Sequence, residues 1–209
     1  MIFENYKKEI CDFGRRMYEK GYTAANDGNI SIKIGDKILI TPTGVSKGFM
    51  SPDMMVIIDI NGNKIEGENE PSSEFKMHLQ VYKEDKTVKS VVHAHPPFAT
   101  AYAVAGKSLN KKIMPETVIN LGSVPVAKYG TPSTNEIPKS IVGLIKNNNA
   151  LLLENHGALT WGGTLKDAYF KMETLEFYAH ILTITENITG NKELSTKDIK
   201  KLIETFNLN

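Results

Sequence analysis

The sequence predicts an α/β fold in which helices cover a mixed β-sheet. The first half of the chain contains two hairpin signals, because alternating or apolar runs flank the short turns Gly35-Asp36 and Asn61-Gly62. The second half alternates between helix-like and strand-like segments, an arrangement that places helices against a sheet. The hairpin strands are expected at residues 29–34 and 37–40, and at residues 55–60 and 63–65.

The remaining elements follow from hydrophobic spacing and from helix start and stop signals. In residues 4–20, apolar side chains recur every three or four positions and Gly21 follows, which is typical of an amphipathic helix. The last expected helix spans residues 195–206, with Ser195 as its N-cap. Between these two we expect helices at residues 73–83, 98–105, 134–146 and 165–186. Strands are expected at residues 88–95, 124–127, 150–154 and 159–161, the last two forming a pair.

The composition limits the class of protein. The chain has 209 residues, of which 41% are apolar and 23% charged, as in globular proteins. It contains no repeat, low-complexity stretch or linker, so we expect one domain over residues 1–209. A formal net charge of +1 leads us to expect no nucleic-acid or membrane partner. The charged N-terminus, the lack of an apolar run of ~20 residues and the single cysteine, Cys11, predict a cytoplasmic protein.

Three of the five histidines lie in two short motifs at predicted strand ends. His93 and His95 are two residues apart, so their imidazoles project from one face of a strand and can reach one metal ion. His156 follows a second buried-type strand, and Gly157 after it indicates a backbone bend. Histidines at strand ends also bond to the backbone without binding metal. Catalytic zinc sites favour three protein ligands and an open position, so we predict one zinc ion per chain.

Glu74 is a fourth candidate ligand and the candidate catalytic residue. It ends the motif Pro71-Ser72-Ser73-Glu74 at an expected helix start, where such residues are also typical of plain N-terminal capping. Free N–H groups and the positive end of the helix dipole suit a phosphate at the same place. A carboxylate beside a metal acts as a ligand, as a base, or as each in turn. His78, one helical turn later, either orients Glu74 or packs against the sheet, and His180 is assigned to the core or the surface.

Two further loops have the composition of anion cradles, although each alone is more often an ordinary turn. One contains Gly28 and Asn29 before the first strand, and the other contains Thr43 and Gly44 after the second strand. Neither has the glycine pattern of a nucleotide-binding loop.

Five motifs together have the order and spacing found in the class II aldolase/adducin family, which the chain resembles over nearly its whole length. They are Gly28-Asn29-Ile30-Ser31, Thr41-Pro42-Thr43-Gly44, Pro71-Ser72-Ser73-Glu74, His93-Ala94-His95-Pro96 and Asn155-His156-Gly157. The resemblance implies a three-layer α/β/α subunit with a central mixed, largely antiparallel sheet. It also implies a homotetramer with active sites between neighbouring subunits.

The resemblance implies roles for the motif residues as well. Zinc is then held by His93, His95 and His156. Glu74 ligates zinc at rest and becomes the proton-transfer residue once substrate displaces it. The residues implied for the substrate phosphate are Gly28, Asn29, Thr43, Gly44, Ser72 and Ser73.

The implied reaction is zinc-dependent cleavage of a ketose 1-phosphate, such as L-fuculose 1-phosphate. Its products are dihydroxyacetone phosphate and a short aldehyde such as lactaldehyde, formed through an enediolate that zinc stabilises. Residues 113–117 read Ile-Met-Pro-Glu-Thr where a bacterial aldolase of the family carries a tyrosine, so Glu116 and Tyr129 are the candidates for the aldehyde-side acid.

Other activities of the same fold remain as alternatives. A pentulose-phosphate 4-epimerase carries aspartate in place of Glu74, so the glutamate argues against it. A methylthioribulose-1-phosphate dehydratase shares the three-histidine site and is excluded less firmly. A non-catalytic, adducin-like interaction module predicts missing ligands, whereas the three histidines and Glu74 are all present.

Overall fold

The computed structural model describes residues 2–188 and 190–208, and its centre is an eight-stranded sheet. The strands are β1 (Asn29–Ile34), β2 (Lys37–Ile40), β3 (Val56–Asp59), β4 (Lys64–Glu66), β5 (Ser90–Ala94), β6 (Val126–Ala127), β7 (Ala150–Leu153) and β8 (Gly157–Gly162). Their order is β4-β3-β2-β1-β5-β8-β7-β6. Each neighbouring pair is antiparallel except β6–β7, which is parallel. The prediction of a mixed, largely antiparallel sheet is therefore confirmed.

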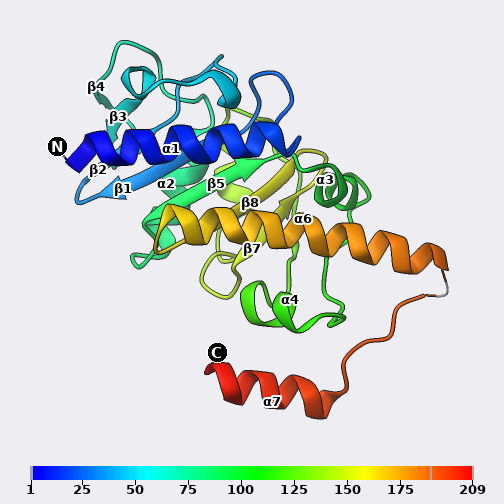
Figure 1. The fold of residues 1–209 in the computed structure, drawn as a ribbon. Coiled ribbons are helices and arrows are strands. Elements are labelled where there is room, and N and C mark those ends of the chain that lie inside the picture. The colour runs from blue at the N-terminus through cyan, green and yellow to red at the C-terminus, as the bar shows by residue number, and fades with distance from the viewer. Residues whose placement is uncertain (1, 189, 209) are drawn as a thin grey trace.

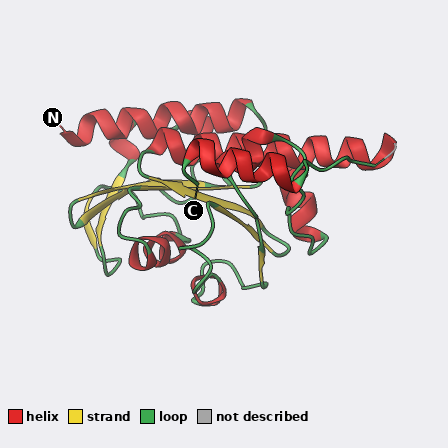
Figure 2. Ribbon diagram, turned by 90° about the horizontal axis from the view of Figure 1, so that it is seen from below, coloured by secondary structure: helices red, strands yellow, loops and turns green. Residues whose placement is uncertain are grey.

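Helices cover both faces of this sheet and give three layers (Figures 1 and 2). One face is covered by α1 (Ile2–Glu19), α3 (Pro97–Val104) and α6 (Leu165–Ile188), and the other by α2 (Phe75–Glu84) and α5 (Glu136–Ser140). Beside the first layer, α4 (Pro115–Asn120) packs with α7 (Thr196–Phe206), whose predicted N-cap Ser195 accepts the Asp198 N–H. Two short 3₁₀ turns, Lys47–Phe49 and Pro52–Met54, precede β3.

Alternation along the strands divides the core into two clusters. In β1, Ile30 and Ile32 pack toward α1 and α6, whereas Asn29 and Ser31 contact residues of the α2 segment. In β5, Val92 belongs to the first cluster and Val91 to the second. The face covered by α2 therefore carries polar side chains at the ends of otherwise apolar strands.

Both predicted hairpins and the pairing of β7 with β8 are confirmed, and the main differences concern short helices. The helix predicted over residues 134–146 is regular only over α5, which ends at Ser140, and Gly143 beyond it adopts a φ of 77° through which a helix cannot continue. We did not predict α4, since its six residues are too few to show a helical period.

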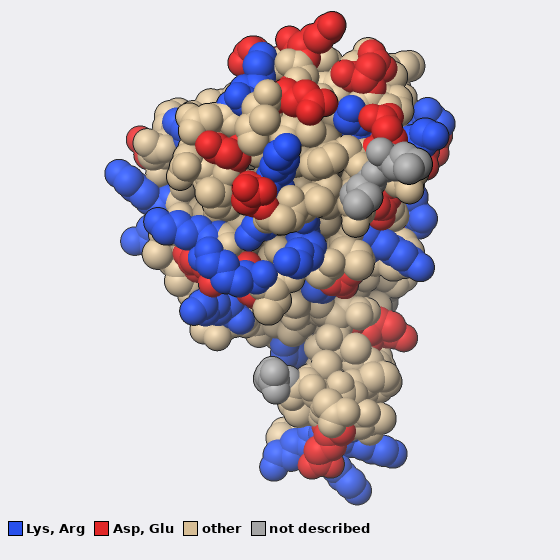
Figure 3. All heavy atoms as spheres, turned by 90° about the vertical axis from the view of Figure 1, so that its left-hand side faces the viewer, with Lys and Arg blue, Asp and Glu red and all other residues tan. Residues whose placement is uncertain are grey.

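Strand register brings the candidate residues to one end of the sheet. Asn29 pairs with His93 across β1 and β5, and His93 pairs with Leu159 across β5 and β8. His156 lies in the turn that joins β7 to β8, directly before the first residue of β8. The surface in Figure 3 carries basic and acidic side chains side by side. Within the described residues, no helix is both long and apolar enough to cross a membrane.

Candidate functional site

The predicted metal ligands His93, His95 and His156 come together at the end of the sheet. One ring nitrogen of each histidine lies within 4.8 Å of those of the other two. The ring centroids are 4.7 to 5.0 Å apart. His93 is fully buried, whereas His95 and His156 are partly exposed, so the cluster has one solvent-facing side.

The second ring nitrogens of two histidines have partners that turn the free nitrogens inward. His93 Nδ1 donates to the carbonyl oxygen of Ala158 at 2.9 Å, and His95 Nδ1 lies 3.4 Å from Asp27 Oδ2. Each ring then presents a bare Nε2, and these two nitrogens are only 3.1 Å apart. Burial is the main cause that lowers the pKa of each of the three imidazoles, to about 4 for His156, so all are neutral at physiological pH. Converging lone pairs of neutral imidazoles fit a divalent cation such as zinc.

Glu74 faces the same centre and does not cap its helix. It occupies the N-cap position of α2, yet its side chain makes no capping hydrogen bond. Its Oε2 lies 3.3 Å from His93 Nε2 and accepts a hydrogen bond from Asn29 Nδ2 at 2.9 Å. Its Oε1 lies 3.4 Å from His156 Nε2 and has no hydrogen-bond partner among the described residues, although it is buried. An unpartnered buried carboxylate oxygen beside bare nitrogens is the second sign that a cation fits here.

Burial raises the pKa of Glu74 above its ordinary value, the Asn29 hydrogen bond opposes that rise, and Asp27 adds to it. A carboxylate of raised pKa among polar side chains suits proton transfer near neutral pH.

The backbone around His156 is shaped for this cluster. Asn155 adopts the left-handed region with a φ of 54°, so the bend that we predicted at Gly157 lies two residues earlier. Gly157 is needed for a different reason, which is close approach. A Cβ there would lie 2.6 Å from the carbonyl oxygen of Ala94 and 2.5 Å from Cδ2 of His95.

The three predicted cradle loops are hydrogen-bonded to one another. The loop at residues 41–44 pairs with the loop at residues 70–73: Thr43 N–H donates to Glu70 O, and Ser72 N–H donates to Thr41 O, both at 3.0 Å. Ile30 N–H donates to Thr41 Oγ1 at 3.2 Å, which ties the start of β1 to the same loops. The three loops that carry the predicted phosphate ligands therefore form one connected structure.

The residues predicted to bind the phosphate differ in their exposure and in the hydrogen bonds that they already make. Thr43, Gly44 and Ser73 are exposed and face solvent, and Ser72 is buried with its Oγ accepting the Glu74 N–H at 3.4 Å. Gly28 has a φ of 74° and is partly buried. The Asn29 side chain, which we predicted as a phosphate ligand, is engaged instead with Glu74 and His78.

Two residues of this region were missed by sequence reasoning. Asp27, the partner of His95, belongs to a loop whose glycine and asparagine alone seemed informative. Lys47 is 1% exposed, and its Nζ donates to the carbonyl oxygens of Asn26, at 3.0 Å, and of Val45. It thereby joins the first two cradle loops. The only signal for Lys47 in the sequence is its proximity to the Thr-Gly motif.

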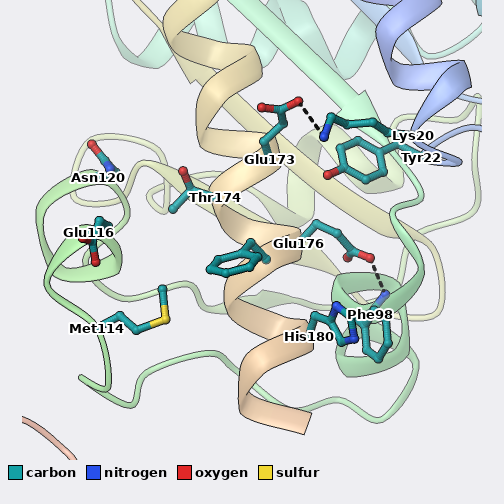
Figure 4. A pocket seen from close by; sticks show the side chains of 11 residues that line it. Lys20, Tyr22, Phe98, Met114, Glu116, Asn120, Glu173, Thr174, Glu176 and His180 are labelled. Atoms are coloured by element: carbon teal, nitrogen blue, oxygen red, sulfur yellow. Dashed lines mark hydrogen bonds and ion pairs between the residues drawn. The ribbon is translucent and has the colours of Figure 1, made fainter. Parts of the chain in front are cut away.

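A separate pocket of about 760 Å³ lies between α6 and the segment that carries α4 (Figure 4). Glu116, one candidate for the aldehyde-side acid, lines it together with His180, whose ring stacks on Phe98 at 3.8 Å. Glu176 accepts the backbone N–H groups of Phe98 and Ala99, so it caps α3. Tyr129, the other candidate, is 53% exposed and lies outside this pocket.

Comparison with known proteins places the chain in a family. The sequence model of the Class II Aldolase and Adducin N-terminal domain matches residues 8–183. An L-fuculose phosphate aldolase of Methanococcus maripaludis is 34% identical over 180 residues, which cover 86% of this chain and 96% of the relative. A 5-deoxy-D-ribulose 1-phosphate aldolase of Bacillus thuringiensis is 31% identical and covers 99% of this chain and 97% of its own.

Another relative is named for a different reaction, and a solved structure has the same fold. A 3-oxo-tetronate 4-phosphate decarboxylase of Haemophilus influenzae is 34% identical over 175 residues, covering 81% of this chain and 83% of its own. Among solved structures, an L-fuculose 1-phosphate aldolase superposes with a TM-score of 0.89 at 29% identity, covering 97% of this chain and 96% of that one. The chain therefore belongs to the class II aldolase and adducin family, and it is an enzyme of the aldolase type.

Proposed function

We propose that this enzyme is a zinc-dependent aldolase that cleaves a short ketose 1-phosphate, such as L-fuculose 1-phosphate, to dihydroxyacetone phosphate and a small aldehyde such as lactaldehyde. The observation that carries the proposal is the convergence of His93, His95, His156 and Glu74 beside a connected set of cradle loops. The relatives named as sugar-phosphate aldolases support the same substrate class.

The three histidines, with Glu74 as a fourth ligand at rest, would hold one zinc ion per chain. A divalent cation there supplies Lewis-acid polarisation of the substrate carbonyl and stabilises negative charge on the enediolate. The phosphate is bound by the backbone N–H groups of Gly28, Gly44 and Ser73 and by the hydroxyls of Thr43, Ser72 and Ser73, with Asn29 at its edge.

Glu74 moves the proton. When the bond between carbons 3 and 4 breaks, its electron pair stays with the dihydroxyacetone phosphate half, and the carbon 4 hydroxyl gives its proton to the Glu74 carboxylate as the aldehyde forms. The carbon that gained the pair must then be protonated, and the Glu74 carboxyl donates to it. The asymmetric partners of the two Glu74 oxygens suit this task, because Asn29 anchors Oε2 whereas Oε1 has no hydrogen-bond partner among the described residues.

A decarboxylase is the second candidate, because one relative at 34% identity is named for decarboxylation of a 3-oxo acid phosphate. Loss of carbon dioxide from such a substrate also leaves a carbanion beside a carbonyl, so the same site chemistry serves both reactions. Dehydration of a ketose phosphate remains a third outcome to test. We also propose that the enzyme assembles as a homotetramer, as its family resemblance implies.

A substrate panel separates these reactions. Ketose 1-phosphates and a 3-oxo acid phosphate are incubated with the zinc-loaded enzyme, and aldehyde release, water loss and carbon dioxide release are measured separately. We expect aldehyde release from a short ketose 1-phosphate to dominate. Dominant water loss or carbon dioxide release would refute the aldolase assignment.

Glu74→Gln is the matching variant for this panel. An amide cannot accept a proton at neutral pH, so we expect hydrogen exchange at the carbon beside the carbonyl of dihydroxyacetone phosphate to fall by about 10²–10⁴-fold. Because the Glu74 side chain makes no capping bond, the variant should remain folded. Wild-type exchange in Glu74→Gln would contradict the role of Glu74 even if cleavage were observed in the wild type.

A further inference from the structure

A buried row of polar side chains runs between α2 and β1 and ends at Glu74. Glu74, His78 and Tyr82 are spaced four residues apart on one side of the α2 segment, and Asn29 and Ser31 are two residues apart on β1. Four helical residues advance about 6 Å and two strand residues about 6.7 Å. Because the two repeats nearly match, side chains of the helix and the strand can alternate along the row.

The contacts along this row are continuous. Asn29 Nδ2 donates to Glu74 Oε2 at 2.9 Å, and Asn29 Oδ1 lies 2.5 Å from His78 Nε2. Ser31 Oγ lies 2.7 Å from His78 Nδ1 and 2.7 Å from the Tyr82 hydroxyl. Ser31, His78 and Tyr82 are completely buried, so no solvent competes for these bonds.

The chemistry of each group fixes the direction of every bond. An ionised carboxylate only accepts, so Asn29 turns its NH₂ to Glu74 and its oxygen to His78. His78 Nε2 must then carry a hydrogen. Burial lowers the pKa of His78 to about 3, so the ring is neutral and its Nδ1 accepts from the Ser31 hydroxyl. The Tyr82 hydroxyl completes the row as donor to Ser31, and all four bonds point toward Glu74.

Resting on the proposed function, we propose that His78 is a positioning residue which, through Asn29, anchors Glu74 Oε2 and thereby fixes the orientation of the carboxylate that transfers the proton. The other carboxylate oxygen, Oε1, is buried, has no hydrogen-bond partner in the described part of the chain and lies 3.4 Å from His156 Nε2. Without the His78 N–H, Asn29 Oδ1 loses its buried donor and the amide is free to rotate away from Glu74.

Three variants test this role in the zinc-loaded enzyme. His78→Leu should slow hydrogen exchange into saturating dihydroxyacetone phosphate by about 10–100-fold, with KM and zinc content unchanged, as expected for loss of an outer-shell partner. His78→Gln should recover part of the rate, since its amide N–H can still reach Asn29. The matched control is Thr160→Val, which deletes a buried 2.8 Å bond from Thr160 to the Ala168 carbonyl on the opposite face of the sheet. It should exchange like the wild type. Unchanged exchange in His78→Leu, or equal slowing in Thr160→Val, would overturn the positioning role.

A measurement on the wild type decides the matter even if His78→Leu does not fold. In protein labelled with ¹⁵N-histidine, the His78 resonances, assigned by their loss in His78→Gln, should show a protonated Nε2 and a bare Nδ1. Asn29→Leu, which removes the oxygen that accepts from Nε2, should abolish this fixed tautomer. The opposite tautomer, or an imidazolium at neutral pH, would overturn the inference. Lack of exchange by the wild type would count against the proposed function alone, because the tautomer is measured without substrate.

Discussion

Replacing Gly157 by alanine changes no ligand residue but should weaken metal binding, because the added Cβ would lie 2.5 Å from Cδ2 of the His95 ring. An added Cβ would lie 2.6 Å from the carbonyl oxygen of Ala94, whereas ordinary contacts begin near 3.4 Å, so the two strands must separate by about 0.8 Å. Ala94 and Ala158 are register partners, and the shift therefore opens β5 from β8 where His93, His95 and His156 meet. Ligand geometry is productive only within about 0.5 Å. We expect zinc affinity to fall by about 10–100-fold, or roughly 1.4–2.8 kcal/mol.

The assay is competition for zinc between the protein and a chelator of known affinity, followed by a thermal unfolding scan of the zinc-free proteins. Gly163→Ala is the matched control, because it lies just beyond the other end of β8 and a Cβ there meets nothing within 4 Å. That control should bind zinc like the wild type. Wild-type zinc affinity in Gly157→Ala would refute the argument that close packing of the two strands sets the ligand geometry.

Three further outcomes are expected. His95→Ala should lower zinc content well below one ion per chain by elemental analysis, because only two imidazoles remain; full zinc content would contradict the assignment. Ser72→Ala combined with Ser73→Ala should raise KM for a phosphorylated substrate through lost hydroxyl donors, and an unchanged KM would place the phosphate elsewhere. In the zinc-free protein, His78→Gln should make the free energy of unfolding fall less steeply as the pH is lowered. The pKa of His78 is about 3 in the folded protein and 6.5 in the unfolded protein. Between about pH 6.5 and 4.5, therefore, only the unfolded wild type takes up a proton at this residue. Over that range the free energy of unfolding of the wild type should fall by roughly 2 kcal/mol more than that of the variant. Parallel denaturation curves would mean that the folded protein does not hold His78 neutral.

The clustering of the three histidines could be predicted because His93 and His95 share one face of a strand and His156 follows the end of another. Residues two apart on a strand share a face, and a polar residue directly after an apolar run marks the strand end. The register confirms the neighbourhood of β5 and β8 that this reasoning required. For β1, the alternation of Asn29 and Ser31 with Ile30 and Ile32 was also visible in the sequence. The sequence did not show which helix packs against the polar side of this strand.

What escaped prediction depends on tertiary contacts. Lys47 is almost completely buried, whereas lysine is ordinarily exposed, and nothing local indicates that two carbonyl groups converge on its ammonium. Asp27 meets His95 across 68 residues of sequence, so no spacing rule connects them. His78 was left between two interpretations, and the structure gives it both: it packs in the core against β1, and it contacts Asn29, the partner of Glu74.

The backbone that carries Glu74 also carries part of the proposed phosphate cradle. Ser72 Oγ accepts the Glu74 N–H, and the Ser72 N–H is bonded to Thr41 in the next loop. These two loops therefore cannot move independently of each other or of the carboxylate. A phosphate seated on them, as proposed, restrains the same turn that aims Glu74 at the reacting carbon. Binding of the phosphate then also orients the proton-transfer residue. It therefore raises the rate of the chemical step and not only the affinity for the substrate.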